Sequence, residues 1–416
     1  MNQQTGNMRV DGGRLWGSLM AMAEIGPGIA GGNNRQALTD ADREGRLLFQ
    51  RWCADAGLTV GVDAMGSMFA RREGTEADAL PILIGSHLDT QPTGGKYDGV
   101  LGVLAALEVV RTLNDLGLRT RRPVEVVNWT NEEGSRFPPA MIASGVYAGV
   151  HTLDWAYDRT DAAGLRFGDE LERIGFKGEE PVGQRKGHAY FELHIEQGPI
   201  LEEEGVDIGI VTHGQGLRWV EVTLTGKETH TGTTPMDRRL NASLGAARII
   251  DRIETITRAH GEKAVGAVGQ LVFAPNSRNI LPGKVVFTAD LRHPDLATLN
   301  SMADQVKQAA REVAADLGIG VAIEDVGAFD PTAFDEDLLA DLRAGAERLG
   351  YSHRDMVSGA GHDACWVAKT MPSAMIFCPC VDGLSHNEAE EITPEWAGAG
   401  TDVLLQAVLQ AAEVVE

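Results

Sequence analysis

The feature that most constrains this chain is a set of short apolar runs that end abruptly in polar side chains. Residues 81–86, 123–129 and 189–194 are such runs, and a helical stretch, residues 99–116, separates the first two. Short runs without alternation are typical of strands buried on both faces. Strands that alternate with helices predict a layered α/β fold, in which polar residues at the carboxyl ends of the strands mark the ligand crevice.

The chain length of 416 residues is typical of two or three domains. Near residue 214 the pattern changes to strands and helices of a smaller unit: strands at 218–225, 265–273, 284–291 and 321–326, and helices at 238–259 and 296–317. From residue 335 the α/β pattern resumes. We therefore predict a catalytic domain of residues 1–213 and 332–416 that is interrupted by an inserted domain, residues 214–331.

Composition excludes several functional classes. With 37 Lys and Arg against 60 Asp and Glu, the net charge is −23, which predicts no nucleic-acid partner because such binding needs clustered basic residues. No apolar run reaches about 18 residues, so we expect no membrane span. The first residues lack the apolar core of a signal peptide. The 4 cysteines are too few for a disulfide framework, so we expect a cytoplasmic protein.

Histidines and carboxylates cluster just after the buried strands. One such residue is usually structural, but a group of seven on four separate strand ends or the loops that follow is harder to explain without metal ions, because buried charges must be paired or metal-bound. Imidazole and carboxylate without thiolate suit Zn²⁺ or Mn²⁺, and a carboxylate shared by two cations is typical of two-metal hydrolases. The members are His87, Asp89, Asp98, Glu132, Glu133, His194 and His386.

The motifs around these residues make the chain recognisable. Residues 85–90, 94–99 and 131–137 resemble the dinuclear-metal aminoacylase and carboxypeptidase clan. Residues 194–202 resemble its hydantoinase/carbamoylase branch, which contains N-carbamoyl-L-amino acid hydrolases, β-ureidopropionases and allantoate amidohydrolases. Further motifs follow in the expected order at residues 230–236, 279–283, 290–292, 359–364 and 384–388. The resemblance implies a mixed-sheet, exopeptidase-like catalytic domain with an inserted α+β, ferredoxin-like dimerisation or lid domain.

The resemblance also implies roles for the clustered residues. His87, Asp98 and His194 would hold one divalent metal ion, while Asp98, Glu133 and His386 would hold a second. Zn²⁺ is the favoured ion, and Mn²⁺, Co²⁺ and Ni²⁺ are alternatives. By the same resemblance, Glu132 is the general base, and Asp89 orients either the first histidine or that base.

Substrate contacts are implied on both domains. Gln197 suits a ureido group because its amide both donates and accepts hydrogen bonds. His230 resembles the family histidine that polarises the scissile carbonyl, and in relatives a neighbouring subunit supplies it, which implies a homodimer. Arg292 and Asn279 are expected to bind the substrate carboxylate, and Gly361 would let backbone N–H groups approach it.

The expected activity is hydrolysis of the carbamoyl C–N bond of N-carbamoyl-L-amino acids, which yields the amino acid, CO₂ and ammonia. β-Ureidopropionase and allantoate amidohydrolase remain alternatives that share this chemistry. An aminoacylase or dipeptidase is a more distant alternative, disfavoured by His194 and Gln197. A non-catalytic metal-binding or scaffold protein would predict a broken ligand set, whereas every expected position is filled.

Overall fold

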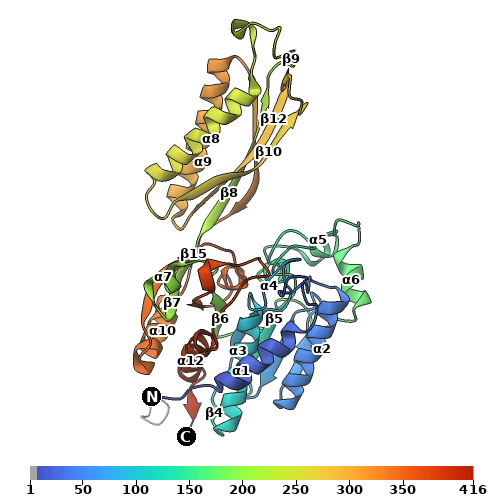
Figure 1. Cartoon of the computed structure of the whole chain (residues 1–416). Coiled ribbons are helices and arrows are strands. Elements are labelled where there is room, and N and C mark those ends of the chain that lie inside the picture. The colour runs from blue at the N-terminus through green and yellow to red at the C-terminus, as the bar shows by residue number, and fades with distance from the viewer. Residues whose placement is uncertain (1–6, 416) are drawn as a thin grey trace. The chain divides into compact units, whose positions relative to one another are not determined.

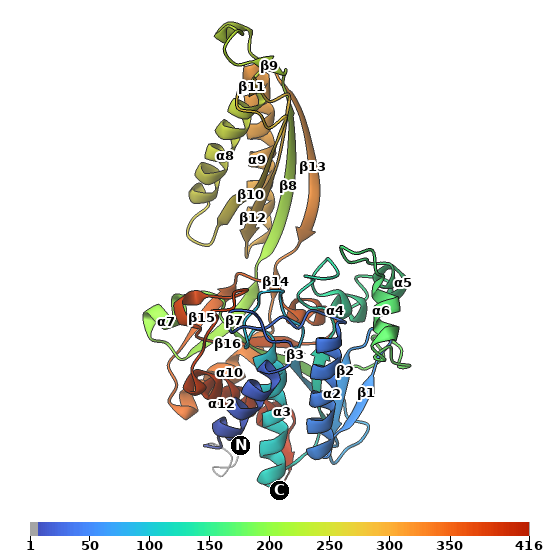
Figure 2. The ribbon, with the colours of Figure 1, turned by 45° about the vertical axis from the view of Figure 1, so that its right-hand side comes forward.

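The structure is a computed structural model, and it describes residues 7–415. The chain divides into two compact units, which are described separately: unit 1 contains Met1–Thr212 and Phe334–Glu416, and unit 2 contains His213–Ala333. Unit 2 therefore begins one residue before the inserted domain expected from the sequence and ends two residues after it. Figures 1 and 2 show both units as ribbons. Within the described residues, no helix combines the length and the apolar character that a membrane span requires.

Unit 1 is built on a mixed sheet whose strand order is β1-β2-β5-β3-β6-β16-β7-β14, with β15 also paired to β7. Its strands are β1 (Thr59–Val62), β2 (Met68–Arg72), β3 (Ile82–His87), β5 (Val124–Trp129), β6 (Ala189–Ile195), β7 (Ile208–Gly214), β14 (Thr332–Ala333), β15 (His353–Ser358) and β16 (Ser373–Cys378). A separate small pair joins β4 (Arg119–Thr120) to β17 (Val414–Val415).

The helices of unit 1 pack around this sheet. They are α1 (Gly12–Ala23), α2 (Asp40–Asp55), α3 (Val100–Asp115), α4 (Ile142–Tyr147), α5 (Leu153–Tyr157), α6 (Phe167–Arg173), α7 (Ile200–Glu204), α10 (Glu336–Leu349), α11 (Asp363–Val367) and α12 (Pro394–Ala411), with a 3₁₀ turn at Val381–Gly383. Helices α1, α3 and α12 contact one another, and α3 also packs on β3 (Figure 2).

The centre of the sheet explains the apolar runs in the sequence. Strands β5, β3, β6 and β16 run parallel to one another, and every residue in them is buried. A strand covered on both faces has no solvent side, so its sequence does not alternate. Because these strands are parallel, their carboxyl ends meet at one edge of the sheet, and the polar residues that follow them are brought together there.

Unit 2 has the ferredoxin-like order of elements. Its sheet runs β10-β12-β8-β13, and all of the pairings are antiparallel. The strands are β8 (Gly216–Thr225), β10 (Val265–Ala274), β12 (Lys284–His293) and β13 (Gly320–Phe329), and the helices are α8 (Ala242–Ala259) and α9 (Leu296–Leu317). Two short strands, β9 (Thr229–His230) and β11 (Ile280–Leu281), form a separate pair.

The core of unit 2 lies between the two helices and one face of the sheet. Val220, Val222 and Leu224 of β8 point into it and are fully buried, together with Ile249 of α8 and Met302 of α9. The residues between those of β8 are partly exposed on the other face, which produces the alternation seen in the sequence.

One element of unit 2 differs from the sequence expectation. The helix predicted from residue 238 begins at Ala242, because the side chain of Asn241 caps it by accepting a hydrogen bond from Leu244 N–H. The preceding residues Met236–Arg238 form a 3₁₀ turn after Pro235. Arg239 donates to the carbonyls of Thr231 and Thr234 and therefore belongs to the turn.

Candidate metal centre

The predicted metal ligands of unit 1 come together at the carboxyl edge of the parallel strands. His87 is the last residue of β3, and His194 lies near the end of β6. Glu133 follows β5, and His386 lies in the loop that follows β16. Four segments that are distant in the sequence therefore each contribute one side chain to the same place.

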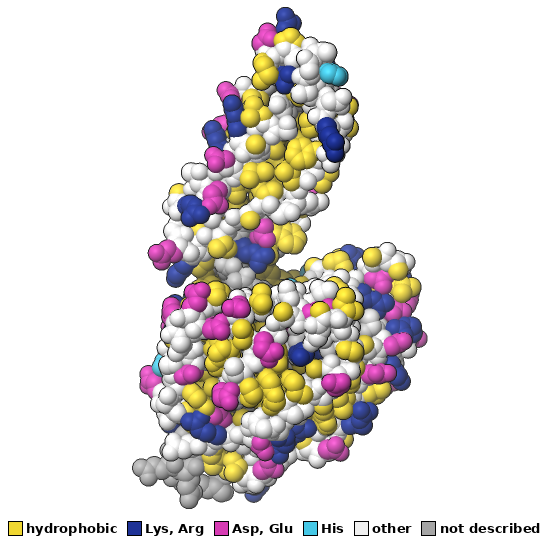
Figure 3. Space-filling model, in the orientation of Figure 1, with side chains coloured by type: hydrophobic (Ala, Val, Ile, Leu, Met, Phe, Trp, Pro, Cys, Tyr) yellow, Lys and Arg dark blue, Asp and Glu magenta, His cyan; other side chains and the backbone are white. Residues whose placement is uncertain are grey.

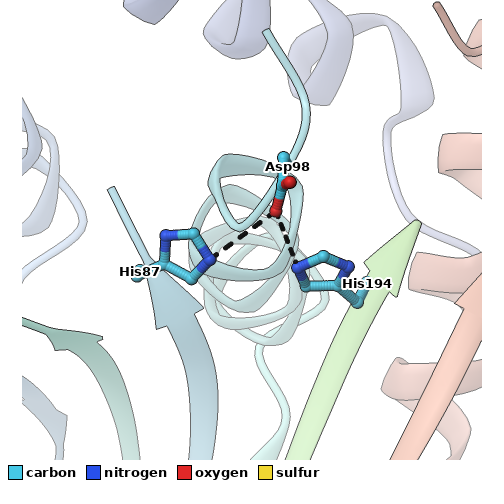
Figure 4. A group of neighbouring side chains, drawn as sticks. All are labelled: His87, Asp98 and His194. Atoms are coloured by element: carbon cyan, nitrogen blue, oxygen red, sulfur yellow. Dashed lines mark ion pairs between the residues drawn. The ribbon is translucent and has the colours of Figure 1, made fainter. Parts of the chain in front are cut away.

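Asp98 also belongs to this group, and it lies two residues before the start of α3. It is followed by Gly99, whose φ is +68° and at which a Cβ atom would lie 2.2 Å from the His87 imidazole. Glycine is required here because it adopts positive φ without strain and leaves room for His87. Figure 4 shows the Asp98 carboxylate above the start of α3, with His87 and His194 both directed at it.

The two oxygens of Asp98 face different histidines. Oδ1 lies 3.0 Å from His194 Nε2 and 3.7 Å from His87 Nε2, whereas Oδ2 lies 3.4 Å from His386 Nε2. Glu133 Oε2 is also 3.4 Å from His386 Nε2. The side chains thus form two possible metal-binding groups, His87–Asp98–His194 and Asp98–Glu133–His386, that share Asp98.

Backbone carbonyls fix the orientation of the two buried histidines. His87 Nδ1 lies 2.9 Å from the carbonyl oxygen of Asp89, and His194 Nδ1 lies 2.9 Å from that of Ile195. A carbonyl oxygen only accepts, so each Nδ1 carries the proton and donates it. Each Nε2 is thereby left to face Asp98, which is the arrangement of metal-ligating histidines.

The charges in this group are strongly perturbed. Burial lowers the pKa of His87 to about 4. Burial also acts against a charged His194, but its hydrogen bond to Asp98 outweighs this and raises the pKa of His194 to about 9. Burial opposes ionisation of Asp98 as well, yet the hydrogen bonds with His194 and His386 hold its pKa well below the usual range.

Glu132 and Glu133 form a pair held by Asp89. The Asp89 carboxylate accepts a hydrogen bond from each of their backbone N–H groups, both at 3.3 Å. The backbone carbonyl of Asp89 accepts a hydrogen bond from His87. Asp89 therefore contacts both of its expected partners, the first histidine and the general base Glu132. Glu132 Oε2 lies 3.4 Å from His87 Nε2, and burial followed by the charges of Asp363 and Glu133 raises the pKa of Glu132 well above its usual range.

The residues present fit two divalent cations. Both groups offer imidazole nitrogen and carboxylate oxygen, and the ligand atoms of each group lie within 4.8 Å of one another. Burial raises the pKa of Glu133 well above its usual range, and the negative charges of Asp98 and Asp89 raise it further. Buried carboxylates that repel each other in this way are stabilised by bound cations.

Glu390, a buried carboxylate that was not predicted from the sequence, fixes the backbone of Asp98. Glu390 Oε1 accepts from the backbone N–H groups of Tyr97 and Asp98, both at 3.0 Å, and a Cβ atom on Gly95 would lie 2.0 Å from its side chain. Ser385 Oγ donates to Asp98 Oδ2 at 3.0 Å. Ser385 lies in the motif of residues 384–388, and Glu390 follows that motif by two residues, so proximity to the motif was the available signal for finding them.

Gln197 binds the shared carboxylate directly. Its Nε2 donates to Asp98 Oδ2 and to Ser385 Oγ, both at 2.9 Å. An ionised carboxylate only accepts, which fixes the amide with its NH₂ group towards Asp98. Within residues 7–415, no group donates to Gln197 Oε1, which is buried. The residue therefore offers an acceptor beside the metal-binding groups.

The remaining substrate-binding candidates of unit 2 fall into two places. His230 lies on β9 and Asn279 lies directly before β11, and Thr231 N–H donates to the Asn279 carbonyl at 2.9 Å. His230 Nδ1 accepts from the N–H groups of Gly232 and Thr233, so its exposed ring carries the proton on Nε2. The ring is thereby set to donate a hydrogen bond.

Arg292 lies at the other end of β12. Its guanidinium donates to both oxygens of Asp290, at 3.0 and 2.9 Å, so the fork expected for a substrate carboxylate is already oriented by an acid. Lys284, at the start of β12, follows β11 closely in sequence, and Arg292 lies eight residue steps further along the strand. At about 3.4 Å per residue this places Arg292 about 27 Å from that end.

Gly361 lies in unit 1, in the exposed loop between β15 and α11. A Cβ atom at this position would lie 2.7 Å from Met141 Cε, so contact with Met141 is one reason for glycine here. Met141 N–H in turn donates to the carbonyl of Glu132 at 2.7 Å. Gly361 is therefore linked to the Glu132 loop through Met141.

Comparisons with known proteins show which family this chain resembles. A model of peptidase family M20/M25/M40 matches residues 83–410. The chain is 64% identical over 410 residues to the N-carbamoyl-L-amino-acid amidohydrolase of Rhizobium meliloti, with 99% of each chain covered. It is 36% identical over 371 residues to the allantoate amidohydrolase of Escherichia coli (strain K12), covering 89% of this chain and 90% of that one.

Among solved structures, an amidase of the hydantoinase/carbamoylase family from Burkholderia multivorans matches with a TM-score of 0.93 and 54% identity, covering 97% of this chain and 98% of that chain. The match extends over nearly the whole length of both chains, so it includes the sequences of both units. The chain therefore belongs to peptidase family M20/M25/M40.

Proposed function

We propose that this protein is a metal-dependent amidohydrolase that cleaves the carbamoyl C–N bond of N-carbamoyl-L-amino acids. The products are the free amino acid, CO₂ and ammonia. The observation that carries the proposal is Gln197, whose Oε1 is an acceptor beside the shared Asp98 carboxylate. A carbamoyl group has a terminal NH₂ that can donate to this oxygen, whereas an acyl group has none. The identity of 64% with a relative named for this activity supports the same assignment.

The proposed chemistry uses two cations and one base. Cations held by the two groups that share Asp98 would supply an activated water and polarise the scissile carbonyl. Glu132 takes a proton from water and delivers it to the leaving nitrogen, and its buried carboxylate, 3.4 Å from His87 Nε2, lies beside the metal-binding groups where this transfer would occur. His230 donates from Nε2 to the developing oxyanion. Arg292 and Asn279 bind the substrate carboxylate, and Gly361 borders it.

Zn²⁺ is the proposed metal at both positions. The ligand atoms are imidazole nitrogens and carboxylate oxygens, which this ion accepts readily. Mn²⁺, Co²⁺ and Ni²⁺ accept the same atoms and remain alternatives. The metal content of the purified protein, measured by mass spectrometry, distinguishes them.

We further propose a homodimer in which unit 2 supplies His230 and the neighbouring Asn279 to the partner's metal centre. His230 and Arg292 lie near opposite ends of β12, too far apart for one unit 2 to bring both to the same small substrate. The outer strand β10 exposes Val265, Leu271 and Val272 by 48, 41 and 50%. Figure 3 shows hydrophobic side chains gathered over the part of unit 2 where Figure 1 labels β10 and β12. Exposed apolar strands of this kind favour pairing with a second copy.

The cysteines support a cytoplasmic location. Cys53, Cys365, Cys378 and Cys380 are all buried, and no disulfide joins them within the described residues, a state that reducing compartments preserve.

A substrate panel tests the proposed activity. The metal-loaded enzyme is assayed for ammonia release from N-carbamoyl-L-amino acids, N-carbamoyl-β-alanine and allantoate, and for amine release from N-formyl and N-acetyl amino acids. We expect the highest kcat/KM on an N-carbamoyl-L-α-amino acid. A preference for allantoate or N-carbamoyl-β-alanine would show that the proposed substrate is wrong but would leave the proposed metal-dependent hydrolysis of a ureido C–N bond unchanged. A preference for N-acetyl amino acids would contradict the assigned role of Gln197.

A further inference from the structure

We propose that Arg35 is a positioning residue for the metal centre, which it serves by holding the turn His87–Thr90 from behind. This residue lies before the region that the family model matches, which begins at residue 83. The N-terminal segment of the chain would then be part of the catalytic apparatus. The inference rests on the proposed function insofar as that function requires metal ions at His87.

Arg35 contacts the turn at both of its ends. Its Nε donates to the carbonyl of Leu88 at 2.9 Å, and Leu88 lies between the metal ligand His87 and Asp89. Its backbone N–H donates to Thr90 Oγ1 at 2.8 Å, and its carbonyl accepts from Thr90 N–H at 3.0 Å. The backbone of the turn is thus fixed by the side chain and the main chain of one residue.

The same guanidinium is anchored in the N-terminal segment. Nη1 donates to the carbonyls of Met22 and Ile25, at 3.0 and 2.8 Å, and to Asn33 Oδ1 at 3.0 Å. Arg35 is fully buried, and the partners just named are neutral oxygens. Burying a cation whose hydrogen-bond partners are all neutral is costly, so these contacts must offset the cost of its desolvation. Here the side chain joins the end of α1 to the His87 turn.

A glycine in α2 provides independent support. Gly45 lies inside this helix and is buried, and a Cβ atom on it would lie 2.9 Å from Arg35 Cδ. Glycine weakens a helix interior relative to alanine, so its presence there needs a reason. The space that it leaves is occupied by the Arg35 side chain.

Arg35 also adds a positive charge behind the acidic centre. Burial lowers the pKa of Arg35 to about 10, and the negative charges of Asp42 and Asp89 oppose that lowering, so the side chain remains charged at neutral pH. Asp89 is the carboxylate that holds the backbone of Glu132 and Glu133. Arg35 therefore acts on His87 through the turn and on the glutamate pair through Asp89.

The test compares Arg35→Lys with the matched control Arg14→Lys. Lysine keeps the charge but loses the planar fork that reaches several carbonyls at once. Arg14 binds the buried carboxylate of Glu108 and also anchors α1, but its partners Glu108 and Asp115 lie in the second half of α3, away from the His87 turn. Metal-free protein is titrated with Zn²⁺ by calorimetry, and kcat, KM and the midpoint of thermal unfolding are measured for each variant.

We expect Arg35→Lys to weaken one of two metal equivalents by about 10- to 100-fold, the usual effect of losing a residue that supports a ligand. In Arg35→Lys, we expect kcat to fall by a larger factor than KM changes. In Arg14→Lys, we expect a lower midpoint of thermal unfolding but wild-type binding of both metal equivalents. Wild-type metal affinity in Arg35→Lys would overturn the inference, even if its unfolding midpoint fell.

Amide hydrogen exchange of the metal-free protein keeps this result separate from the proposed function. If Arg35 holds the turn, Arg35→Lys exchanges faster than wild type in the peptide covering residues 87–90, and equal rates would overturn the inference. A wild-type protein that binds fewer than two metal equivalents would instead count against the proposed function, while the exchange rates still decide the role of Arg35.

Gly45→Ala is a second variant that leaves Arg35 itself unchanged. Alanine favours the helix but moves the arginine side chain, so we expect weaker binding of the same metal equivalent. An increase in the unfolding midpoint with wild-type metal binding would contradict the inference.

Discussion

At the scale of single residues, Asp98 organises the centre. Its two oxygens face different histidines, and its backbone, side chain and following glycine are each fixed by another part of the chain. The histidines that face it are oriented by backbone carbonyls. A ligand geometry built this way exists before a metal binds, which lowers the cost of binding it.

The sequence predicted which residues meet and that Asp89 supports them, but it did not predict the supporting contacts of Arg35 and Glu390. His87, Asp98 and His194 follow recognisable strands or lie in long motifs, so their convergence could be expected. Arg35 and Glu390 act through backbone atoms, and which N–H or carbonyl group a side chain will meet depends on tertiary packing. A motif shows that a residue is present and gives no information on such contacts.

The role of Glu132 gives the first prediction. Glu132→Gln keeps the size of the side chain but removes its ability to take a proton, so we expect kcat to fall by about 10²- to 10⁴-fold while metal content is unchanged. Steady-state ammonia release and metal analysis of the same sample measure both quantities.

Glu125→Gln is the matched control for this prediction. It removes a buried carboxylate from β5 that pairs with Arg71 and Arg185, and it should lower thermal stability without lowering kcat. Full activity in Glu132→Gln would contradict the assignment of Glu132 as the general base.

At the scale of elements, the burial of a helix or strand determined how well its position could be predicted from the sequence. The fully buried strands β3, β5 and β6 have largely apolar sequences with few polar residues and were predicted within a residue or two of their bounds. Helix α1 was not predicted, since three of its 12 residues are glycine and its apolar face is recognisable only when packed against α3 and α12. The two-residue strands β9 and β11 are set by pairing across the chain, which a local pattern does not contain.

The β1–β2 hairpin gives a pH prediction. Asp63, in its turn, accepts from Met65 and Ser67 N–H groups, and burial raises its pKa to about 7. An acid whose pKa is higher in the folded state binds more protons there, so its contribution makes the protein less stable as pH rises from about 4 to 7. We expect Asp63→Asn, which has no such proton to lose, to flatten this decline.

Urea unfolding of wild type and Asp63→Asn at a series of pH values between 4.5 and 7.5 measures the effect. Other buried acids contribute equally to both proteins, so the difference between the two slopes belongs to Asp63. Identical slopes would mean that Asp63 is ionised in the folded protein.

At the scale of the whole molecule, a net charge of −23 opposes the approach of an anionic substrate. Capture must then depend on local positive charge, which the proposed metal ions and Arg292 would provide. The family could be inferred from motifs alone because they extend along the whole chain. The relative positions of His230 and Arg292 required the sheet register of unit 2.

Mixing two inactive variants tests whether sites are shared between copies. If His230 acts on the partner's centre, dimers that contain one Glu132→Gln chain and one His230→Ala chain have one complete site. Random exchange of subunits should then restore about a quarter of wild-type activity, since half of the dimers are mixed and each has one active site. No recovery after confirmed subunit exchange would indicate that His230 acts within its own chain or not at all.

The most direct test of the central claim is a metal titration of the metal-free enzyme in which ammonia release from an N-carbamoyl-L-amino acid is followed at each step. Two ligand groups that share Asp98 predict that activity is absent without metal and reaches its maximum at two equivalents per chain, and that Asp98→Asn loses both equivalents. Full turnover without metal, or two intact equivalents in Asp98→Asn, would contradict the shared centre.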